Sequence, residues 1–400
     1  MNPKTPSTVL TAETKPTRVP KLRFPEFRGA EGWKPSVLAD ACDMQAGKFV
    51  SASNISERIQ NGFFPCYGGN GLRGFTATHT HNGTYPLIGR QGALCGNVRL
   101  ASGQFHATEH AVVATPKEAI DVGWLFYSLD LLNLNRFATG QAQPGLSVDV
   151  LEHVALAIPP LEPEQQKIAE CLSSADELMA AQAWKVDALK THKKGLMQQL
   201  FPREGETQPR LRFPEFQNAP AWEVKPLGRV AENLDNKRVP ITSSDRKAGD
   251  VPYYGASGIV DYVEGFIFDE DLLCVSEDGA NLVARTYPIA FPISGKTWVN
   301  NHAHVLRFEN ACTQKFVEVY LNSIKLDDFI TGMAQPKLNK AMLDRIPIPH
   351  PRVPEQQLIA SCLSSLDALI TAETQKLEAL KTHKKGLMQQ LFPSTEAVEA

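Results

Sequence analysis

The string LKTHKKGLMQQLFP occurs twice in this chain of 400 residues, at positions 189–202 and again, letter for letter, at positions 380–393. Fourteen identical residues placed 191 positions apart indicate that the chain holds two copies of one sequence unit. An internal repeat of this length constrains the architecture more than any local motif does, because each structural element is then expected twice.

The repeat extends well beyond that string. The lead-in PKLRFPEF at 20–27 returns as PRLRFPEF at 209–216, and PEQQ at 163–166 returns at 354–357. TGQAQP at 139–144 has its counterpart in TGMAQP at 331–336. Each copy therefore combines a short lead-in, a long stretch that differs between the copies (33–157 and 222–346) and a nearly constant tail.

The constant tails are expected to be long helices. Between 164 and 200 there is no proline, and Pro163 and Pro354 stand where a first helical turn accepts proline. Phe201-Pro202 and Phe392-Pro393 end the helices, because the residue before a proline avoids the helical region. Apolar residues recur with a seven-residue period, and they are Ile168, Leu172, Met179, Val186, Leu189, Leu196, Leu200, Ile359, Leu363, Leu366, Ile370, Leu377, Leu380, Leu387 and Leu391.

This narrow apolar seam predicts that the two tails pair with each other as an antiparallel coiled coil, which creates an internal pseudo-twofold axis. The alternative is that each helix packs on its own globular domain. The variable stretches contain Gly-rich loops, short β-like runs and few helices, of which 122–133 and 314–323 are the clearest. They predict two globular domains of mixed α/β structure, so the fold class is α+β.

Composition narrows the environment of the chain. The net charge is −3, so a nucleic-acid-binding role requires positive charge gathered on one face. The seven cysteines show no CxxC pair, which favours reduced thiols and a cytoplasmic location. No apolar run reaches the length of a membrane span, and residues 1–19 have the Thr/Pro/Lys-rich composition of a disordered tail.

Signatures of catalysis are weak. Residues 69–74 fit GxGxxG, which leaves open a nucleotide-binding enzyme, but the dinucleotide fold needs a helix directly after this loop and the following residues are poor helix formers. The second copy breaks the pattern. His79 and His81 lack a second pair of metal ligands in the sequence, so no metal site is expected. No catalytic residues are assigned.

Taken together, the duplicated tails, the divergent domains and several strings resemble the DNA specificity subunit of type I restriction-modification systems, the HsdS family. The resemblance covers 20–393, and the strings that carry it are YGGNG at 67–71, LIGRQGA at 87–93, TGQAQP at 139–144, IPPL at 158–161, PEQQ at 163–166 and the repeated LKTHKKGLMQQLFP. A helical scaffold without a nucleic-acid role is the remaining alternative.

The resemblance implies a division of the chain into two target recognition domains, 20–157 and 206–346, two conserved spacer helices, 158–205 and 347–393, and a tail at 394–400. Each recognition domain is expected to read one half of an asymmetric, bipartite site in double-stranded DNA. Two modification (methyltransferase) subunits and restriction (translocase and endonuclease) subunits are the expected partners. S-adenosylmethionine, ATP and Mg are expected on those partners, and no cofactor on this chain, which the resemblance makes non-catalytic.

Side chains that reach base edges are expected on loops. Arg pairs with guanine, Asn or Gln with adenine, and Asp or Glu accepts from cytosine. The candidates lie in the loop at 89–92, in its counterpart at 276–279 and in the loops at 139–147 and 331–340; they are Arg90, Gln91, Gln143, Glu277, Asp278, Gln335, Lys337, Asn339 and Lys340. An ordinary hairpin tip is the alternative for 89–92. The basic runs at 190–194 and 381–385 either complement a helix C-terminus or contact phosphate or a partner.

Overall fold

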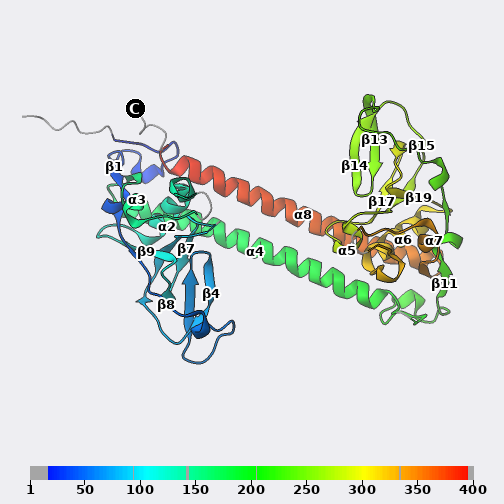
Figure 1. Ribbon diagram of the computed structural model, residues 1–400, viewed down its shortest axis with the longest axis horizontal. Helices are drawn as coiled ribbons and strands as arrows, with labels where there is room; N and C mark the ends of the chain where they lie inside the picture. Colours follow the sequence, from blue (N-terminus) through cyan, green and yellow to red (C-terminus); the bar gives the residue numbers. More distant parts are fainter. Residues whose placement is uncertain (1–16, 93, 141–143, 204, 333–334, 395–400) are drawn as a thin grey trace, which may run out of the picture. The chain divides into compact units, whose positions relative to one another are not determined.

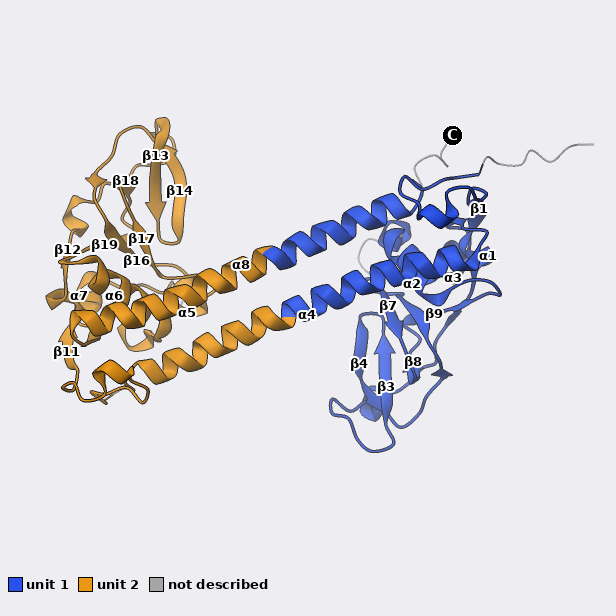
Figure 2. Cartoon of the chain, turned by 180° about the vertical axis from the view of Figure 1, so that it is seen from behind, with its two compact units in different colours: residues 1–183, 376–400 blue, residues 184–375 orange. Residues whose placement is uncertain are grey.

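The computed structural model describes residues 17–92, 94–140, 144–203, 205–332 and 335–394. The chain divides into two compact units (Figure 2). We call Met1–Ala183 together with Lys376–Ala400 the first unit, and Trp184–Gln375 the second unit. The boundary falls within the two long helices, so each helix contributes to both units.

The first unit contains two four-stranded sheets and a two-stranded one (Figure 1). All pairings are antiparallel except that of β3 with β8. One sheet has the order β2-β9-β6-β7, formed by Cys42–Ala46, Ala111–Pro116, Tyr85–Gly89 and Val98–Ala101. The other has the order β4-β3-β8-β5, formed by Gly71–Thr76, Phe64–Gly68, Gln104–Ala107 and His81–Asn82, and the small sheet pairs β1 (Lys34–Val37) with β10 (Ala155–Ile158).

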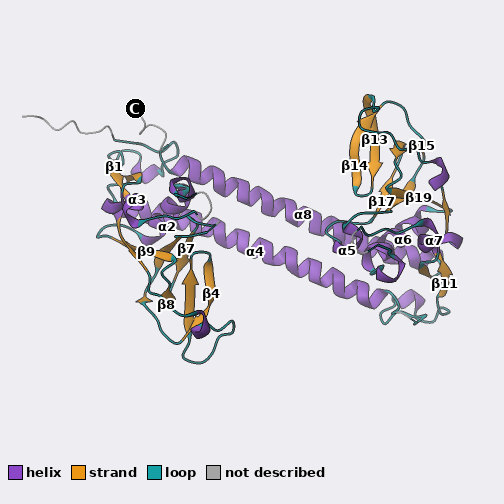
Figure 3. Cartoon of the chain, in the orientation of Figure 1, coloured by secondary structure: helices purple, strands orange, loops and turns teal. Residues whose placement is uncertain are grey.

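The second unit repeats this topology strand for strand, and β13 and β18 form the parallel pairing that corresponds to that of β3 and β8. The first sheet has the order β12-β19-β16-β17, formed by Ala231–Asn233, Ala303–Phe308, Leu272–Ser276 and Ala290–Ile293. The second has the order β14-β13-β18-β15, formed by Gly258–Val263, Ala248–Gly255, Lys296–Val299 and Phe268–Asp269, and β11 (Glu223–Pro226) pairs with β20 (Pro347–His350). The α+β fold class predicted for the variable stretches is confirmed, and strands and helices mix in both units (Figure 3).

The short helices follow the expected positions. The helices predicted at 122–133 and 314–323 are α2 (Val122–Leu131) and α6 (Ala311–Ser323). Each helix is capped at its N-terminus by a side chain that accepts a hydrogen bond from a backbone N–H three residues later. Asp121 accepts from Trp124 N in α2, and Asn310 accepts from Thr313 N in α6. The described residues also form the single-turn α-helices α1 (Leu38–Ala41), α3 (Val148–Glu152), α5 (Asn281–Ala284) and α7 (Lys340–Asp344), besides short 3-10 helices.

The constant tails form two helices of 39 residues each, α4 (Glu162–Leu200) and α8 (Val353–Leu391). At 1.5 Å per residue each helix is about 58 Å long. Both end directly before the Phe-Pro pair, as predicted from the conformational restriction that proline places on the preceding residue.

The two helices run antiparallel where they pair. In the second unit, Lys185 Nζ lies 2.5 Å from Glu373 Oε1 and Lys193 Nζ lies 2.5 Å from Asp367 Oδ1, so the α8 partner moves back along the chain as the α4 residue moves forward. In the first unit Lys384 Nζ lies 2.6 Å from Asp176 Oδ1. Lys384 and Asp176 are the repeat counterparts of Lys193 and Asp367, so the same contact recurs with the two helices exchanged.

All fifteen residues predicted for the seam are buried or partly buried. Near the helix ends they also enter the globular cores, so both of the packing modes considered for the tails occur. The basic runs are partly accounted for by these contacts, since Lys193 and Lys384 pair with carboxylates of the opposite helix rather than with a helix C-terminus.

The cores use the helix ends in a crossed fashion. The core of the first unit surrounds Trp33 and Trp124 and contains the start of α4, at Ile168, together with the end of the other repeat's helix, at Leu391 and Phe392. Phe392 packs edge-on against Trp33 with ring centroids 5.8 Å apart. The core of the second unit correspondingly holds the end of α4 and the start of α8, through Leu200, Phe201, Ile359 and Leu363.

A buried ion pair ties each lead-in to the start of a long helix. Arg23 donates to both oxygens of Glu164 at 2.7 Å, and these hydrogen bonds raise the pKa of Arg23. Arg212 makes the same bidentate contact with Glu355 at 2.7 and 2.8 Å. The repeated strings LRFPEF and PEQQ therefore meet in space and serve the attachment of the helices.

The GxGxxG match at 69–74 lies in a β-hairpin. It forms the turn between β3 and β4 and continues into β4, and no helix follows it. The dinucleotide-binding arrangement needs a helix N-terminus at that point, so the match is not such a motif, and the hairpin gives the alternative of a nucleotide-binding enzyme no support. Within the described residues, none of the helices has the combination of length and apolarity that crossing a bilayer requires.

Candidate nucleic-acid interface

In the first unit the two candidate loops are joined by their backbones. Gly92 N donates to Pro144 O at 3.1 Å, and Leu146 N donates to Arg90 O at 2.9 Å. Gln91 forms an antiparallel bridge with Gly145. The loop that follows β6 and the loop that precedes α3 therefore present one continuous surface.

The second unit joins its loops in the same register. Gly279 N donates to Pro336 O at 3.1 Å, Leu338 N donates to Glu277 O at 2.7 Å, and Asp278 bridges Lys337. The structure thus superimposes Glu277 on Arg90 and Asp278 on Gln91, as the repeat alignment predicted. Identical backbone contacts hold opposite charges at one position.

A third loop, the tip of a β-hairpin, lies against these two. In the first unit Gly69 O approaches Gly89 so closely that a Cβ built at Gly89 lies 2.1 Å from it, which explains the glycine. In the second unit the counterpart of Gly89 is Ser276, whose hydroxyl donates to Ala256 O at 2.5 Å. The hairpins β3–β4 and β13–β14 are therefore anchored to the loops by contacts at the same place.

A cavity of about 480 Å³ lies between the hairpin tip and the loop at 89–92 of the first unit. Its lining includes the hairpin tip from Gly68 to Arg73, together with Gln91, Gly92 and His110. Arg99, on β7, reaches the hairpin from the side, where its Nε lies 3.9 Å from a Cβ built at Gly71. Positive charge gathers here on a chain whose net charge is negative, as phosphate or base recognition requires.

Two of the three candidates of the first unit can be located. Gln91 is exposed and lines the cavity, whereas Arg90 is partly buried and its Nε donates to Leu146 O at 3.3 Å. Gln143 lies outside the described residues. The role of all three in base reading stays a prediction.

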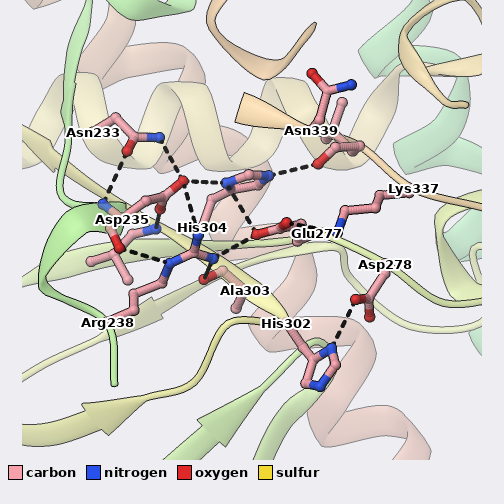
Figure 4. A network of polar contacts seen from close by, with 12 residues as sticks. Asn233, Asp235, Arg238, Glu277, Asp278, His302, Ala303, His304, Lys337 and Asn339 are labelled. Atoms are coloured by element: carbon pink, nitrogen blue, oxygen red, sulfur yellow. Dashed lines mark hydrogen bonds and ion pairs between the residues drawn. The ribbon is translucent and has the colours of Figure 1, made fainter. Parts of the chain in front are cut away.

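In the second unit a network of charges lies beneath the loops (Figure 4). Arg238 donates to Glu277 Oε2 at 2.6 Å and lies 3.4 Å from Asp235 Oδ2. Lys337 Nζ lies 3.2 Å from the other oxygen of Glu277. The carboxylate of Glu277 is therefore occupied from both sides and only 12% exposed, so it positions the loop in this structure and does not face solvent.

His304 completes the network. Its Nε2 faces the carbonyl oxygen of Leu338 at 2.7 Å and its Nδ1 faces Asp235 Oδ2 at 2.6 Å. A carbonyl oxygen can only accept, so Nε2 carries a proton. Burial by itself raises the pKa of Asp235, but the hydrogen bonds from His304 and Val305 N and the charges of His304 and Arg238 outweigh it and lower that pKa.

Asp235, Glu277 and His304 bring three potential metal-ligating atoms within 4.8 Å of one another. Arg238 contacts both carboxylates of this group, and His304 Nδ1 is engaged by Asp235. The negative charges are thus already compensated by protein cations, and the group is built as an ion-pair network rather than as an open metal site. The ring of His81 stacks on Phe105 with ring centroids 5.3 Å apart.

The remaining candidates of the second unit lie at its surface. Gln335, Lys337 and Lys340 are exposed, and Asp278 Oδ2 lies 2.8 Å from Nδ1 of the exposed His302. Asn339 caps α7, with its side-chain oxygen accepting from Met342 N at 3.0 Å. The structure therefore brings Glu277, Asp278, Lys337 and Asn339 together (Figure 4), and their assignment to DNA stays a prediction.

Sequence reasoning missed the residues that support these loops. Arg73 and Arg99 of the first unit lie outside the strings that recur, and Arg238 and His304 of the second have no charged counterparts in the repeat. The sequence does hold one signal for Arg73. When the matched strings at 65–68 and 252–255 are aligned, Arg73 falls opposite Val260 five residues later, so a charged residue in one copy faces an apolar one in the other.

Comparisons with known proteins agree on one family. A family model described as "Type I restriction modification DNA specificity domain" matches the chain twice, over residues 30–191 and 220–382. The specificity subunit of the type I restriction enzyme EcoprrI from Escherichia coli is 46% identical over 146 residues, which is 36% of each protein. A putative specificity subunit from Haemophilus influenzae is 40% identical over 147 residues, 37% of this chain and 38% of the relative.

These two alignments thus span little more than a third of the relatives' own length. A longer alignment joins the chain to the putative MjaX specificity subunit of Methanocaldococcus jannaschii, with 26% identity over 306 residues, 72% of this chain and 71% of the relative. Among solved structures, the type I S subunit from M. genitalium covers 94% of this chain and 99% of its own with a TM-score of 0.69 at 18% identity, a likeness of fold.

Proposed function

Because the chain belongs to the family of type I restriction-modification DNA specificity domains, of which it carries two copies, we propose that it is the DNA-recognition subunit of a type I restriction-modification complex. The loop surface of the first unit reads one half of a bipartite site in double-stranded DNA, and that of the second unit reads the other half. One observation carries this proposal: identical backbone contacts present Arg90 and Gln91 in one unit but Glu277 and Asp278 in the other.

This contrast fits DNA recognition better than it fits a scaffold without a nucleic-acid role. Base edges differ in their donors and acceptors, so two half-sites of different sequence need different side chains on one framework. A helical scaffold gives no reason for the loops to diverge while the strands beneath them keep their order and register.

The partners follow from the same premise. Two modification subunits, which bind S-adenosylmethionine and methylate adenine, attach to the chain, and restriction subunits that use ATP and Mg join them. The chain itself is non-catalytic and acts in the cytoplasm. The repeated helices support the attachment of two identical subunits. Leu178 and its repeat counterpart Leu369 are 59% and 42% exposed, so the chain offers the same apolar contact twice.

The test is selection of bound sequences from a randomised DNA pool by a purified complex that contains the full-length chain. We expect one site with two unlike halves about one helical turn (roughly 34 Å) apart. The affinity should fall steeply with salt, since phosphate contacts release counterions. A pool without an enriched site, or an enriched single uninterrupted sequence, contradicts the proposal.

The assignment of activities is tested separately. The isolated chain is titrated with S-adenosylmethionine and ATP by calorimetry, and no binding is expected. Tight binding of either by this chain contradicts the non-catalytic role. Methylation-sensitive sequencing of the source genome should find methylated adenines in the selected site.

A further inference from the structure

Both hairpins contain a bulge at the same place. In the first unit Cys66 pairs with Gly74 and Tyr67 with Leu72, so Arg73 is the extra residue of β4. In the second unit Tyr253 pairs with Asp261 and Tyr254 with Ile259, so Val260 is the extra residue of β14. A bulge leaves one residue out of the ladder and turns its side chain in a new direction.

The two bulge side chains point the same way. Arg73 Cδ lies 3.7 Å from a Cβ built at Gly68, and Val260 Cγ1 lies 3.0 Å from one built at Gly255. Gly68 and Gly255 are repeat counterparts, so each bulge residue lies over the same glycine of the neighbouring strand. The position is therefore one structural site that carries two chemistries.

This site adjoins the reading loops. Thr108 Oγ1 also lies 3.6 Å from the Cβ built at Gly68, and Asn300 Nδ2 lies 3.4 Å from the one built at Gly255. Asn300 Oδ1 accepts from the backbone of His302, and His302 contacts Asp278. Arg73 lines the cavity that Gln91 also lines.

Both side chains are available to a ligand. Arg73 is exposed and takes part in none of the ion pairs found among the described residues, and Val260 is 53% exposed. The residue before each bulge keeps its apolar character, as Leu72 in one copy and Ile259 in the other. The bulge thus changes from a cation to an apolar side chain, and the residue after it also differs, as Gly74 in one copy and as Asp261, paired with Arg246, in the other.

The change from Arg to Val decides between two kinds of DNA contact. Phosphates are the same in every sequence, so a position that serves the backbone needs a donor in both copies. Valine cannot hold a phosphate, but it can contact the methyl group of thymine, and arginine is the commonest partner of guanine O6 and N7. The divergence thus favours base reading at this position.

We propose that the bulge position of the hairpin determines specificity in both halves, with Arg73 donating to a guanine of the first half-site and Val260 packing against a thymine methyl of the second. This inference rests on the DNA recognition proposed above and extends it to a position outside the loops at 89–92 and 276–279. Under this proposal the first half-site is recognised at this position through hydrogen-bond acceptors of a guanine, and the second through the methyl group of a thymine.

The guanine contact is tested by replacing each guanine of the selected site in turn with 7-deazaguanine, which lacks the N7 acceptor. One replacement in the first half should weaken binding by the wild-type complex about tenfold. The same replacement should have no further effect on Arg73→Val, which already lacks the donor. If no replacement in the first half weakens wild-type binding, or if it weakens both proteins equally, the assignment of Arg73 is wrong.

The thymine contact is tested by replacing thymines of the second half with deoxyuridine, which removes only the methyl group. One replacement should weaken wild-type binding about threefold to fivefold, the effect of one buried methyl group. Val260→Ala should lose this sensitivity and keep its reading of the first half. A wild-type complex indifferent to every such replacement overturns the assignment of Val260.

Arg28→Val serves as the matched control, because it removes the same charge from an exposed position outside the three loops. It should leave the sequence preference unchanged. If Arg73→Val behaves like it, with binding weakened equally on all sequences, Arg73 serves phosphate and the proposal fails. If the wild-type complex selects no site at all, the proposed function itself fails, and the two failures are thereby distinguished.

Discussion

The loop surfaces of the two units differ in what lies beneath them more than in how they are built. The first unit holds Arg90 by a single bond to a backbone carbonyl, and its cavity is bordered by arginines. The second unit holds Glu277 between Arg238 and Lys337, above a buried pair of Asp235 and His304. One backbone thus accepts opposite charges, with the carboxylate of Glu277 compensated by two cations and Arg90 bonded to a backbone carbonyl.

The largest expected effect concerns what the units share. Glu164→Ala leaves Arg23 buried without its partner, and we expect the first unit to lose about 3–5 kcal/mol of stability. Glu355→Ala should act likewise on the second unit. Denaturant unfolding with limited proteolysis identifies which unit opens.

The two losses should not be equal. Trp33 also donates to Glu164 at 3.1 Å, whereas Trp222 has no hydrogen-bond partner among the described residues. Glu164→Ala should therefore be the costlier change. Equal losses contradict a stabilising role for the tryptophan contact.

The second effect belongs to one unit only. Arg238→Met removes hydrogen bonds to Glu277 and to the carbonyl of Ala303, and leaves two carboxylates less compensated. We expect a loss of about 2–3 kcal/mol in the second unit and weaker discrimination at the second half-site. Selection from a randomised DNA pool measures the sequence preference at both half-sites. The first half-site serves as the internal control, because it is read by a unit without this network. A changed sequence preference at the first half-site argues against independent reading by the two units.

The third effect depends on pH. Asp235 has a lowered pKa in the folded protein, so it contributes stability that is fully present above its ordinary pKa of 3.8 and is lost as the pH falls toward the folded value. The stability difference between the wild type and Asp235→Asn should therefore be largest near neutral pH and shrink below about pH 4. Urea unfolding of both proteins between pH 3 and 7 measures it, and a constant difference contradicts the assignment.

The smallest effect compares one lysine in two settings. Lys384 contacts both oxygens of Asp176 and lies 5.1 Å from the ring centroid of Tyr127, whereas Lys193 contacts one oxygen of Asp367. Lys384→Ala should cost about 1 kcal/mol and Lys193→Ala about 0.5 kcal/mol or less, as exposed and partly exposed pairs do. Thermal unfolding of both variants measures the difference, and the reverse order contradicts the role of Tyr127.

Repetition and periodicity were enough to predict the long helices, because proline limits and heptad spacing act locally. They placed the ends of α4 and α8 at Leu200 and Leu391 and the seam residues on the inner face. The recurrence of both strings also marked the loops at 89–92 and 139–147 as candidates, but it did not predict that their backbones pair. Local rules therefore predicted the elements and the candidate loops.

What the sequence did not predict depends on contacts between distant residues. Arg238 reaches Glu277 across 39 positions, and Asp235 reaches His304 across 69. The bulge that turns Arg73 outward is set by the register of β3 with β4, which no single strand encodes. Such features follow from how elements meet, so they become visible only when the fold is known.

The crossed use of the helix ends has a consequence for synthesis on the ribosome. The globular part made first needs Phe392, which is translated 359 residues after Trp33, to cover that tryptophan. At 5–20 residues per second the roughly 200 residues between Ala183 and Phe392 take about 10–40 s to appear. During that interval the nascent chain exposes a tryptophan-lined gap, so the part translated first is completed last.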